Sequence, residues 1–342
     1  MEKKILIIQT AFIGDVVLTI PLVKVLKEYQ NDIEIDFLCI PETANLLNGN
    51  PLINEVIVYD KKGTDKGFTG LINIFKKIRK RKYDIVLSPH RSYRSALISF
   101  LSNSQNRISF DRSSLSFLYT QKVKYLKGVH EIIRNLKLLE PLGIQKTEII
   151  KPDLFPSEVD KTTVDKLLKS YGINDNDRFI VVAPGSIWFT KRFPEEKFIS
   201  LINYFSENDF KIVLSGSKSD YELCGRILNA SANTKIYNLA GELSLLQSAE
   251  LIKRGKLLIT NDSAPLHIAN SVETDVIAIF GATVTDFGFY PYGKNDIVFE
   301  INGLDCRPCG IHGGSKCPVK TFDCMLKINE KEIYRTVLKM LS

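Results

Sequence analysis

The sequence predicts an α/β protein built from two doubly wound, Rossmann-like domains. Short apolar, β-branched segments alternate with segments of helical periodicity, which is typical of parallel sheets covered by helices on both faces. The alternation stops in a polar, proline-marked stretch near residues 150–165 and then begins again. A chain of 342 residues is long enough for two cores. We therefore expect an N-terminal domain over residues 1–160 and a C-terminal domain over 161–342, with the last helix a candidate to pack back on the first domain.

The first domain opens with a predicted strand over residues 4–9, a glycine turn and a helix over 16–29. The alternation then predicts strands over 34–40, 55–59 and 85–88, and helices over 42–47, 69–80 and 92–101. In the second domain it predicts strands over 179–183, 211–215, 235–238, 257–260 and 276–280, with helices between them. Ligands of such sheets bind at the loops that follow the carboxyl ends of the strands, so functional residues are expected there.

The composition is that of an ordinary globular protein, with 44% hydrophobic and 25% charged residues. No apolar stretch has the length of a membrane span or of a signal peptide, so we expect a cytoplasmic protein. Lys and Arg exceed Asp and Glu by 46 to 39, a net charge of +7 that suits anionic substrates or an anionic membrane face. The excess does not by itself indicate nucleic acid.

The densest group of basic residues lies within residues 76–82. Its simplest interpretation is the solvated C-terminal end of a helix, where cations also complement the helix dipole. Docking on a membrane surface is the alternative.

The loop after the first strand contains Gly14 and Asp15. Gly14 allows a tight turn, and Asp15 is expected at or near the N-terminus of the next helix, where it is either a functional carboxylate or only an N-cap. The loop has one glycine instead of Gly-x-Gly-x-x-Gly, which argues against a nicotinamide-dependent dehydrogenase.

The loop after residues 179–183 combines small, hydroxyl and basic residues, namely Gly185, Ser186, Thr190, Lys191 and Arg192. Backbone amides, hydroxyls and two cations together can hold a phosphate group, although the spacing is not that of a Walker motif. We interpret this loop as a phosphate-binding loop.

A third loop follows residues 257–260 and contains Asp262, Ser263, Ala264, Pro265 and His267. Ser263 can cap the next helix and Pro265 suits its first turn, so the free amides of that helix would face an anion such as a diphosphate. His267 is either part of this site or a satisfied core histidine.

Four of the six cysteines, Cys306, Cys309, Cys317 and Cys324, crowd the C-terminal side. In a cytosolic protein such a group is compatible with structural zinc, but the short second spacing of a zinc ribbon is missing. Buried or redox-sensitive thiols are the alternative interpretation.

Taken together, these motifs resemble those of bacterial lipopolysaccharide heptosyltransferases of glycosyltransferase family 9. The resemblance covers nearly the whole chain and rests on Gly14-Asp15, Lys191-Arg192-Phe193-Pro194, the loop from Asn261 to His267, Arg94-Ser95-Ala96-Leu97, His130-x3-Arg134 before Pro141-Leu142-Gly143, and the cysteine-bearing tail. The tail looks most like the heptosyltransferase II branch. The family's fold is the GT-B type, in which two Rossmann-like domains face a central cleft.

The resemblance implies inverting, metal-independent transfer of a heptose from ADP-heptose to the lipopolysaccharide inner core, without a cofactor. The implied place is the cytoplasmic side of the inner membrane, in peripheral contact with its anionic surface. It implies that Asp15 is the base, that Lys191 binds the diphosphate, and that Asp262, Ser263 and His267 surround the donor. The rest of the predicted donor site comprises Gly14, Gly185, Ser186, Thr190, Arg192 and Ala264, with Asp220 and Glu222 as looser matches to the residue that holds the ribose.

For the acceptor, whose sugars carry carboxylates and phosphates, we expect Arg91, Arg94 and Arg107 to cluster after the strand at 85–88. Solvated surface arginines are the alternative. Two other functions remain as alternatives: a related transferase that uses another nucleotide sugar, and a non-enzymatic protein that binds zinc or nucleic acid.

Overall fold

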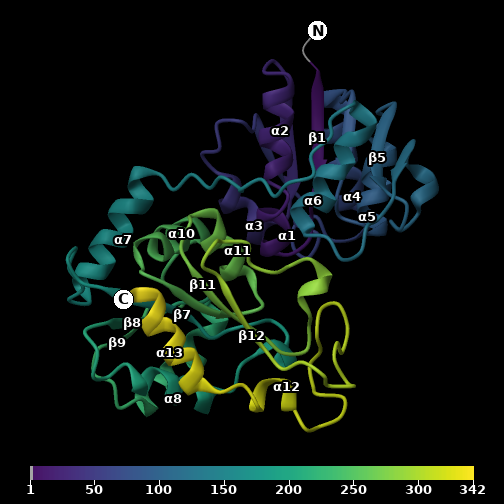
Figure 1. Cartoon of the computed structure of the whole chain (residues 1–342). Helices are drawn as coiled ribbons and strands as arrows, with labels where there is room; N and C mark the ends of the chain where they lie inside the picture. Colours follow the sequence, from purple (N-terminus) through teal and green to yellow (C-terminus); the bar gives the residue numbers. More distant parts are fainter. Residues whose placement is uncertain (1–2) are drawn as a thin grey trace. The chain divides into compact units, whose positions relative to one another are not determined.

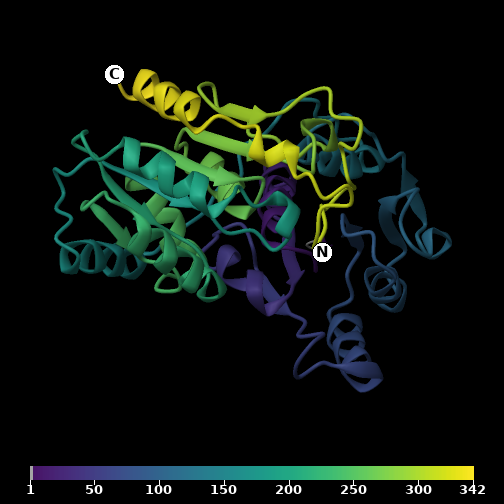
Figure 2. The ribbon, with the colours of Figure 1, turned by 90° about the horizontal axis from the view of Figure 1, so that it is seen from below.

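The computed structural model describes residues 3–342, and the chain divides into two compact units, Met1–Phe155 and Pro156–Ser342. Each unit is an α/β layer structure with a parallel sheet between helices (Figures 1 and 2). The expected division lay at residue 160. Each unit is described by itself below.

The sheet of the first unit has six parallel strands in the order β3-β2-β1-β4-β5-β6. Its strands are β1 (Lys4–Ile8), β2 (Glu34–Cys39), β3 (Glu55–Val58), β4 (Ile85–Ser88), β5 (Asn106–Phe110) and β6 (Gln121–Val123). Strand β1 pairs with both β2 and β4, with Ile5 opposite Ile35 on one side and Ile85 on the other. Apolar residues on both faces of β1 are buried, as a central parallel strand requires.

The helices of the first unit are α1 (Ile13–Val17), α2 (Pro21–Tyr29), α3 (Pro41–Ala44), η1 (Asn45–Leu47), α4 (Gly67–Arg81), α5 (Tyr93–Leu101), η2 (Ser116–Leu118), α6 (Glu131–Leu136) and η3 (Lys137–Leu142). Helix α2 packs with α6, whereas α4 and η2 both pack with α5.

The single helix expected over residues 16–29 is in fact two helices, α1 and α2. The break precedes Pro21, which has no amide to donate and whose ring clashes with the preceding helical turn. As a result α1 is a short helix directly after β1, and it holds Gly14 and Asp15.

The sheet of the second unit has the order β12-β11-β10-β7-β8-β9, again all parallel. Its strands are β7 (Phe179–Ala183), β8 (Lys211–Leu214), β9 (Ile236–Asn238), β10 (Leu258–Asn261), β11 (Val276–Phe280) and β12 (Ile297–Glu300). With the strands of each unit counted in chain order, both sheets have the order 3-2-1-4-5-6 of the Rossmann fold. The strand order therefore reverses between β1 and β4 and between β7 and β10, the points where such sheets bind ligands.

The helices of the second unit are α7 (Glu158–Ser170), η4 (Phe189–Lys191), α8 (Glu195–Tyr204), η5 (Lys218–Asp220), α9 (Tyr221–Ala230), α10 (Leu245–Arg254), α11 (Ala264–Ser271), η6 (Thr285–Phe287), α12 (Asp323–Leu326) and α13 (Glu330–Leu341). Helix α7 begins inside the polar stretch that marked the division of the chain. Ser157 and Asp160 form a reciprocal capping box there, and Val164 and Leu168 are its buried residues.

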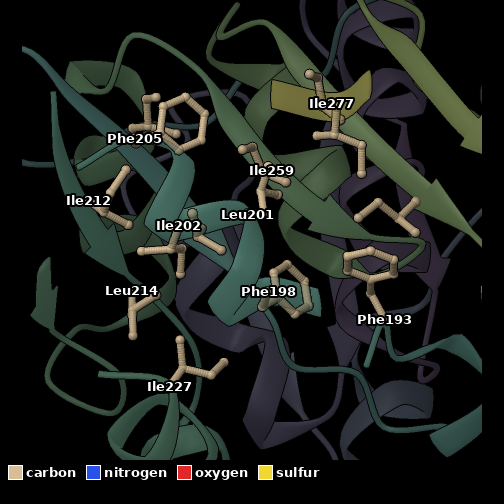
Figure 3. Packing of buried hydrophobic residues seen from close by; sticks show 14 of the residues in the cluster. Phe193, Phe198, Leu201, Ile202, Phe205, Ile212, Leu214, Ile227, Ile259 and Ile277 are labelled. Atoms are coloured by element: carbon tan, nitrogen blue, oxygen red, sulfur yellow. The ribbon is translucent and has the colours of Figure 1, made fainter. Parts of the chain in front are cut away.

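The core of the second unit includes Phe193, Phe198, Leu201 and Ile202 (Figure 3). The last helix, α13, packs against α8 of the same unit and adds two buried residues, Ile333 and Val337, to this core. Across residues 3–342, every helix is too short or too polar to cross a membrane.

Candidate active site

In the first unit, Asp15 lies directly after β1 at the reversal of strand order. The N-cap of α1 is Phe12, and Asp15 lies in the first helical turn, so Asp15 is not an N-cap. Its backbone carbonyl accepts a hydrogen bond of 2.7 Å from the Thr19 hydroxyl. This hydrogen bond holds the backbone of Asp15 in place.

Several cations gather at the same edge of the sheet. The Lys61 ammonium donates to the Thr10 carbonyl at 2.7 Å, and the Thr10 hydroxyl lies 2.9 Å from Nδ1 of His90. Burial, followed by repulsion from Arg94, lowers the pKa of Lys61. Burial, with Lys61 and Arg91 nearby, lowers the pKa of His90 to about 4. The imidazole is therefore neutral at pH 7, whereas the surrounding groups favour an anion.

Lys61 and His90 did not stand out in the sequence. Lys61 lies in the loop after β3 and His90 in the loop after β4. Only the order of the strands in the sheet brings these loops beside Thr10 and Arg94. The sequence offered one signal for His90, because this residue follows the buried strand β4 by two positions.

Arg107 does not join this group, which corrects the expected cluster of three arginines. It is the second residue of β5, opposite Val86, and so lies toward the amino end of the sheet. Its guanidinium donates to the carbonyls of Leu118 and Ser104 and lies over the ring of Phe100. Arg107 therefore connects loops at the amino ends of the strands, whereas the predicted site lies at their carboxyl ends.

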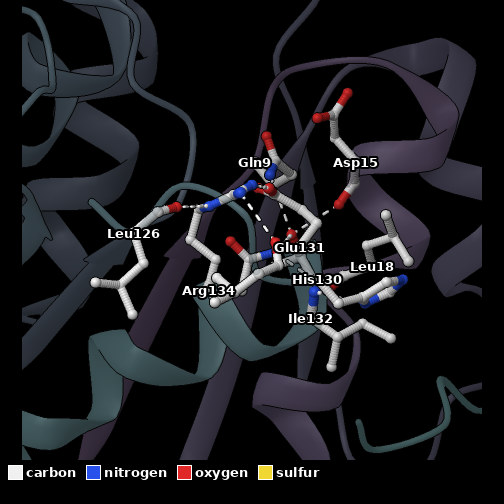
Figure 4. Close-up of polar contacts among 11 residues, drawn as sticks. Gln9, Asp15, Leu18, Leu126, His130, Glu131, Ile132 and Arg134 are labelled. Carbon is white, nitrogen blue, oxygen red and sulfur yellow. Dashed lines mark hydrogen bonds and ion pairs between the residues drawn. The ribbon is translucent and has the colours of Figure 1, made fainter. Parts of the chain in front are cut away.

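A buried polar network lies under Asp15 (Figure 4). The Thr19 hydroxyl, which donates to Asp15, accepts from the amide groups of Gln9 at 3.0 Å and Asn135 at 3.4 Å. Asn135 also donates to the carbonyl of Leu18 at 3.1 Å. In Figure 4 the carbonyl of Asp15 faces this network and its carboxylate points away from it. The network thus supports α1 through the backbone of Asp15, and the Asp15 carboxylate is not a member of it.

Beside this network, Glu131 forms a buried ion pair with Arg134 (Figure 4). Burial raises the pKa of Glu131 to about 7, opposed by Arg134 and reinforced by the charge of Asp15. Arg134 also donates to the carbonyls of Leu126 and Val129. Its guanidinium lies 4.6 Å from the ring of Tyr125, and that of Arg91 lies 4.2 Å from the same ring. Arg134 of the His130-x3-Arg134 motif and Arg91 thus contact the same ring, and Tyr125 links the motif to Arg91.

In the second unit, the buried side chain of Asn261 joins the loop after β7 to the end of β10. Its amide donates to the Pro184 carbonyl at 2.8 Å, and its carbonyl accepts from the Phe193 amide at 2.9 Å. The predicted phosphate-binding loop thus has its two ends fixed to one residue.

The same loop lies against Asp220. A Cβ on Gly185 would lie 2.3 Å from a carboxylate oxygen of Asp220, so only glycine allows this approach. Asp220 accepts from the amide and hydroxyl of Ser217 at 2.8 and 2.6 Å. Asp220 therefore completes the capping box of η5, whose N-cap is Ser217, while it lies beside the phosphate-binding loop. Glu222 is exposed and is the second residue of α9.

The two principal motifs of the second unit meet in an ion pair. The Lys191 ammonium lies 2.6 Å from a carboxylate oxygen of Asp262, and the Thr283 hydroxyl donates to the same oxygen at 2.6 Å. Asp262 is 5% exposed. Lys191 is thereby positioned at the start of α11 by a buried carboxylate.

Ser263 occupies the N-cap position of α11, Ala264 is the first helical residue and Pro265 follows. The Ser263 hydroxyl lies 3.3 Å from the Thr260 hydroxyl and 3.4 Å from the Asn261 carbonyl. It accepts no hydrogen bond from the helix, so the expected side-chain cap is absent. His267 is buried one turn into the helix, with its ring 6.2 Å from that of Phe289.

The other predicted donor residues are part of the same loop. The guanidinium of Arg192 donates to the Ser186 carbonyl at 2.6 Å and so closes the loop on itself. Thr190 is buried, and its hydroxyl accepts from the Gly314 amide at 2.7 Å. Thr190 thus connects the loop to the cysteine-bearing tail.

The tail is held by Arg307, which donates to the carbonyls of Gly281 and Thr283 at 2.6 and 2.7 Å. Within residues 3–342, no group of three or more His, Cys, Asp or Glu side chains is arranged to hold a metal ion. All four tail cysteines are free thiols, and Cys324 is packed into the hydrophobic core. Burial raises the pKa of Cys324 to about 11. Structural zinc at these cysteines stays a prediction.

Two units of the same doubly wound topology, with charged loops at both reversals of strand order, have the architecture of glycosyltransferases of the GT-B type. A family model described as glycosyltransferase family 9 (heptosyltransferase) matches residues 71–315. Lipopolysaccharide heptosyltransferase 3 of Escherichia coli (strain K12) is 30% identical over 311 residues, which cover 86% of this chain and 87% of that protein. The chain belongs to glycosyltransferase family 9 and is a transferase.

Solved structures confirm the fold. The glycosyl transferase family 9 protein from Veillonella parvula DSM 2008 matches with a TM-score of 0.89 and 24% identity, over 100% of this chain and 98% of that one. The E. coli ADP-heptose lipopolysaccharide heptosyltransferase II matches with a TM-score of 0.81 and 22% identity, over 99% and 98% of the two chains.

Proposed function

We propose that this enzyme transfers a heptose from ADP-heptose to the lipopolysaccharide inner core, with inversion and without a metal ion. The observation that carries the proposal is the buried Lys191–Asp262 ion pair at the start of α11, where the predicted phosphate-binding loop meets the loop after β10. The names of the relatives reported above support the sugar and the acceptor.

The donor is bound by the second unit in this proposal. Lys191 and the N-terminal amides of α11 bind the diphosphate, since both present positive charge at the end of β10. Gly185, Ser186 and Arg192 form the loop beside them, and Asp220 lies close enough to Gly185 to reach a ribose hydroxyl.

Asp15 is the base in this proposal. Its carboxylate takes the proton of the attacking acceptor hydroxyl while that oxygen forms a bond to the anomeric carbon. The bond from the anomeric carbon to the diphosphate oxygen breaks on the opposite side, and ADP leaves with the electron pair. One displacement of this kind inverts the anomeric centre.

Positive charge on the enzyme stabilises the departing ADP. Lys191 and the α11 dipole supply it at the point where negative charge develops, which is the role that a divalent cation has in metal-dependent transferases. Activity should therefore persist after dialysis against EDTA.

The first unit binds the acceptor in this proposal. Lys61, Arg91 and Arg94 gather at the edge of the sheet that carries Asp15, and their charges suit the carboxylates and phosphates of the inner core. Arg107 is left out because its guanidinium is used by backbone carbonyls at the other edge. Since this acceptor is anchored in a membrane, we infer peripheral contact with the anionic inner-membrane surface.

The test is a competition among nucleotide sugars. Purified enzyme is incubated with heptose-free inner-core acceptor and an equimolar mixture of ADP-heptose, ADP-glucose, UDP-glucose and GDP-mannose, and the product is analysed by mass spectrometry. We expect the acceptor to gain one heptose, and NMR of the product to show inverted anomeric configuration. Transfer of a different sugar would favour the alternative family 9 transferase, and retention of configuration would exclude the single displacement.

A further inference from the structure

One layer of the first unit combines strong positive charge with exposed aromatic rings. Helix α4, helix α5 and η2 form this layer, since both α4 and η2 pack with α5 (Figures 1 and 2). We call it the α4–α5–η2 face. None of its residues has a part in the catalytic chemistry proposed above except those at the start of α5.

The charge of this face is almost entirely of one sign. Residues 66–82 include seven Lys and Arg and no Asp or Glu, and residues 91–118 include four arginines and one aspartate. The chain as a whole has a net charge of only +7, so positive charge is concentrated here. Such concentration attracts an anionic surface over a Debye length.

Some of the α4 cations are already neutralised and others are not. Lys77 pairs with Glu55, and Arg81 pairs with Asp36 and Glu55 on the neighbouring strands. Lys76, Arg79 and Lys80 are exposed, and no ion pair is recorded for them within residues 3–342. These three cations are therefore available to bind an external anion.

Exposed phenylalanines accompany the cations. Phe68 at the start of α4 and Phe117 in η2 are each 75% exposed, and Phe100 at the end of α5 is 46% exposed. Arg107 lies over the ring of Phe100, with its guanidinium carbon 5.6 Å from the ring centroid, and donates to the carbonyl next to Phe117. The same layer that carries the unpaired cations therefore also exposes apolar rings that an apolar partner can cover.

We propose that the α4–α5–η2 face docks on a lipid bilayer that contains anionic phospholipid. Basic residues attract the headgroups, and phenyl rings without a polar atom enter the boundary between headgroups and acyl chains. A duplex nucleic acid would also attract the cations, but its outer surface offers nothing apolar to Phe68 and Phe117. The proposal rests on the proposed function only in that a membrane-anchored acceptor requires the enzyme at a bilayer.

The test is sedimentation of the full chain with vesicles. We expect binding to phosphatidylcholine vesicles with one third phosphatidylglycerol, little binding to pure phosphatidylcholine, and release as sodium chloride is raised from 0.1 to 0.5 M. Phe68→Ser/Phe117→Ser and, separately, Lys76→Gln/Arg79→Gln/Lys80→Gln should each lower the vesicle partition coefficient about tenfold or more.

Matched controls remove the same kinds of group from the second unit. Val159→Ser/Tyr221→Ser removes two apolar side chains that are 73% and 57% exposed, and Lys253→Gln/Lys256→Gln/Lys339→Gln removes three exposed cations. These variants should bind vesicles as the parent does. Equal losses in control and test variants, or unchanged binding in both test variants, would overturn the proposal, as would duplex DNA binding that the phenylalanine and the cation variants weaken equally while vesicle binding stays parental.

A second measurement separates this proposal from the proposed function. Heptose transfer is assayed with a water-soluble acceptor fragment and with acceptor embedded in vesicles. We expect the test variants to keep the parental kcat on the soluble fragment and to show a raised KM only on vesicles. If the parent transfers no heptose but still binds anionic vesicles through this face, the proposed function fails and the docking face stands.

Discussion

The buried carboxylate of Asp262 shows how single residues prepare the second unit's site. It is 5% exposed and accepts from both Lys191 and Thr283, so its charge is compensated inside the protein. The cost of this arrangement is that Lys191 and Asp262 depend on each other. A variant of either one changes stability as well as binding.

Lys191→Ala should weaken ADP binding by about 1.5–3 kcal/mol, the value of a lost charge-assisted hydrogen bond. Calorimetry measures this directly. It should also lower the free energy of unfolding, because Asp262 is left buried and charged. The double variant Lys191→Ala/Asp262→Asn should recover stability without recovering ADP affinity. Parental ADP affinity in the single variant would remove Lys191 from the donor site.

Asp15→Asn should reduce turnover by about 100-fold or more while ADP affinity stays within a few-fold, because a general base is lost and the donor site is untouched. Steady-state kinetics with ADP-heptose and acceptor, together with ADP titration, check both parts. Near-parental turnover would assign Asp15 a structural part only.

Glu131 gives the first unit a pH-dependent stability. Its pKa is raised by burial from 4.5 to about 7, so between these values the folded protein retains a proton that the unfolded chain has lost. The contribution to the free energy of unfolding is complete below pH 4.5 and is lost as the pH rises through 7.

Glu131→Gln should therefore flatten this pH dependence. Urea unfolding of both proteins at pH 5 and pH 8 should show that the difference between parent and variant in the free energy of unfolding changes by on the order of 2–3 kcal/mol. His90 titrates in the opposite sense over part of this pH range, but it is present in both proteins and cancels in the difference. Glu140→Gln, which removes an exposed carboxylate from the adjoining η3, is the control. Parallel pH curves for parent and Glu131→Gln would contradict the prediction.

Among the elements, the loops after β7, β8 and β10 form the proposed donor site because they contact one another. Asn261 joins β10 to both ends of the β7 loop, and Asp220 of η5 lies against Gly185 of that loop. Each contact spans tens of residues in sequence. The site is therefore as rigid as the sheet that brings these loops together.

Gly185→Ala should force these loops apart. Its Cβ would lie 2.3 Å from a carboxylate oxygen of Asp220, which Ser217 holds in place, so we expect a destabilisation of about 1–3 kcal/mol and weaker ADP binding. Gly225→Ala is the matched control, since its Cβ would meet nothing nearer than 4.0 Å within α9 and alanine favours helix by about 0.5–1 kcal/mol. Denaturant unfolding and ADP titration of both variants make the comparison. Equal effects of the two substitutions would show that the contact between Gly185 and Asp220 determines neither the stability nor the ADP affinity.

The sequence predicted the elements whose own residues determine them. Buried strands such as β1, β7 and β11 are short runs of Ile, Val and Leu, and the loops after β1, β7 and β10 were recognised by their glycine, hydroxyl and charged residues. Strands β5, β6 and β12 were missed because their residues are of mixed polarity and are only partly buried.

Contacts between distant elements could not be predicted in the same way. The Lys191–Asp262 pair, the approach of Lys61 to Thr10 and the displacement of Arg107 to the amino end of β5 all depend on strand order and register. A single sequence records residue types and local periodicity, whereas register is determined by packing across the sheet. The charged loops were therefore identified, and their internal partners were not.

For the whole molecule, the proposed function requires that only one of two units of the same strand order binds the nucleotide. The reversal in the second unit offers a lysine fixed by a buried carboxylate and the start of an eight-residue helix, α11. The reversal in the first unit offers Asp15 in the five-residue helix α1, whose carboxylate repels a diphosphate. We therefore expect the nucleotide at the second unit, whose loops combine Lys191 with the N-terminus of a longer helix.

Hydrogen exchange with ADP tests this assignment. A ligand at about 100 times its Kd stabilises the state that binds it by about 2.7 kcal/mol, which slows exchange through global opening by about 100-fold. We expect this protection in β7, β8 and β10 and unchanged exchange in β1 and β4. In Lys191→Ala the same ADP concentration should protect β7, β8 and β10 far less, because affinity is reduced. Protection of β1 and β4 instead would place the nucleotide beside Asp15, and the roles proposed for the two units would have to be exchanged.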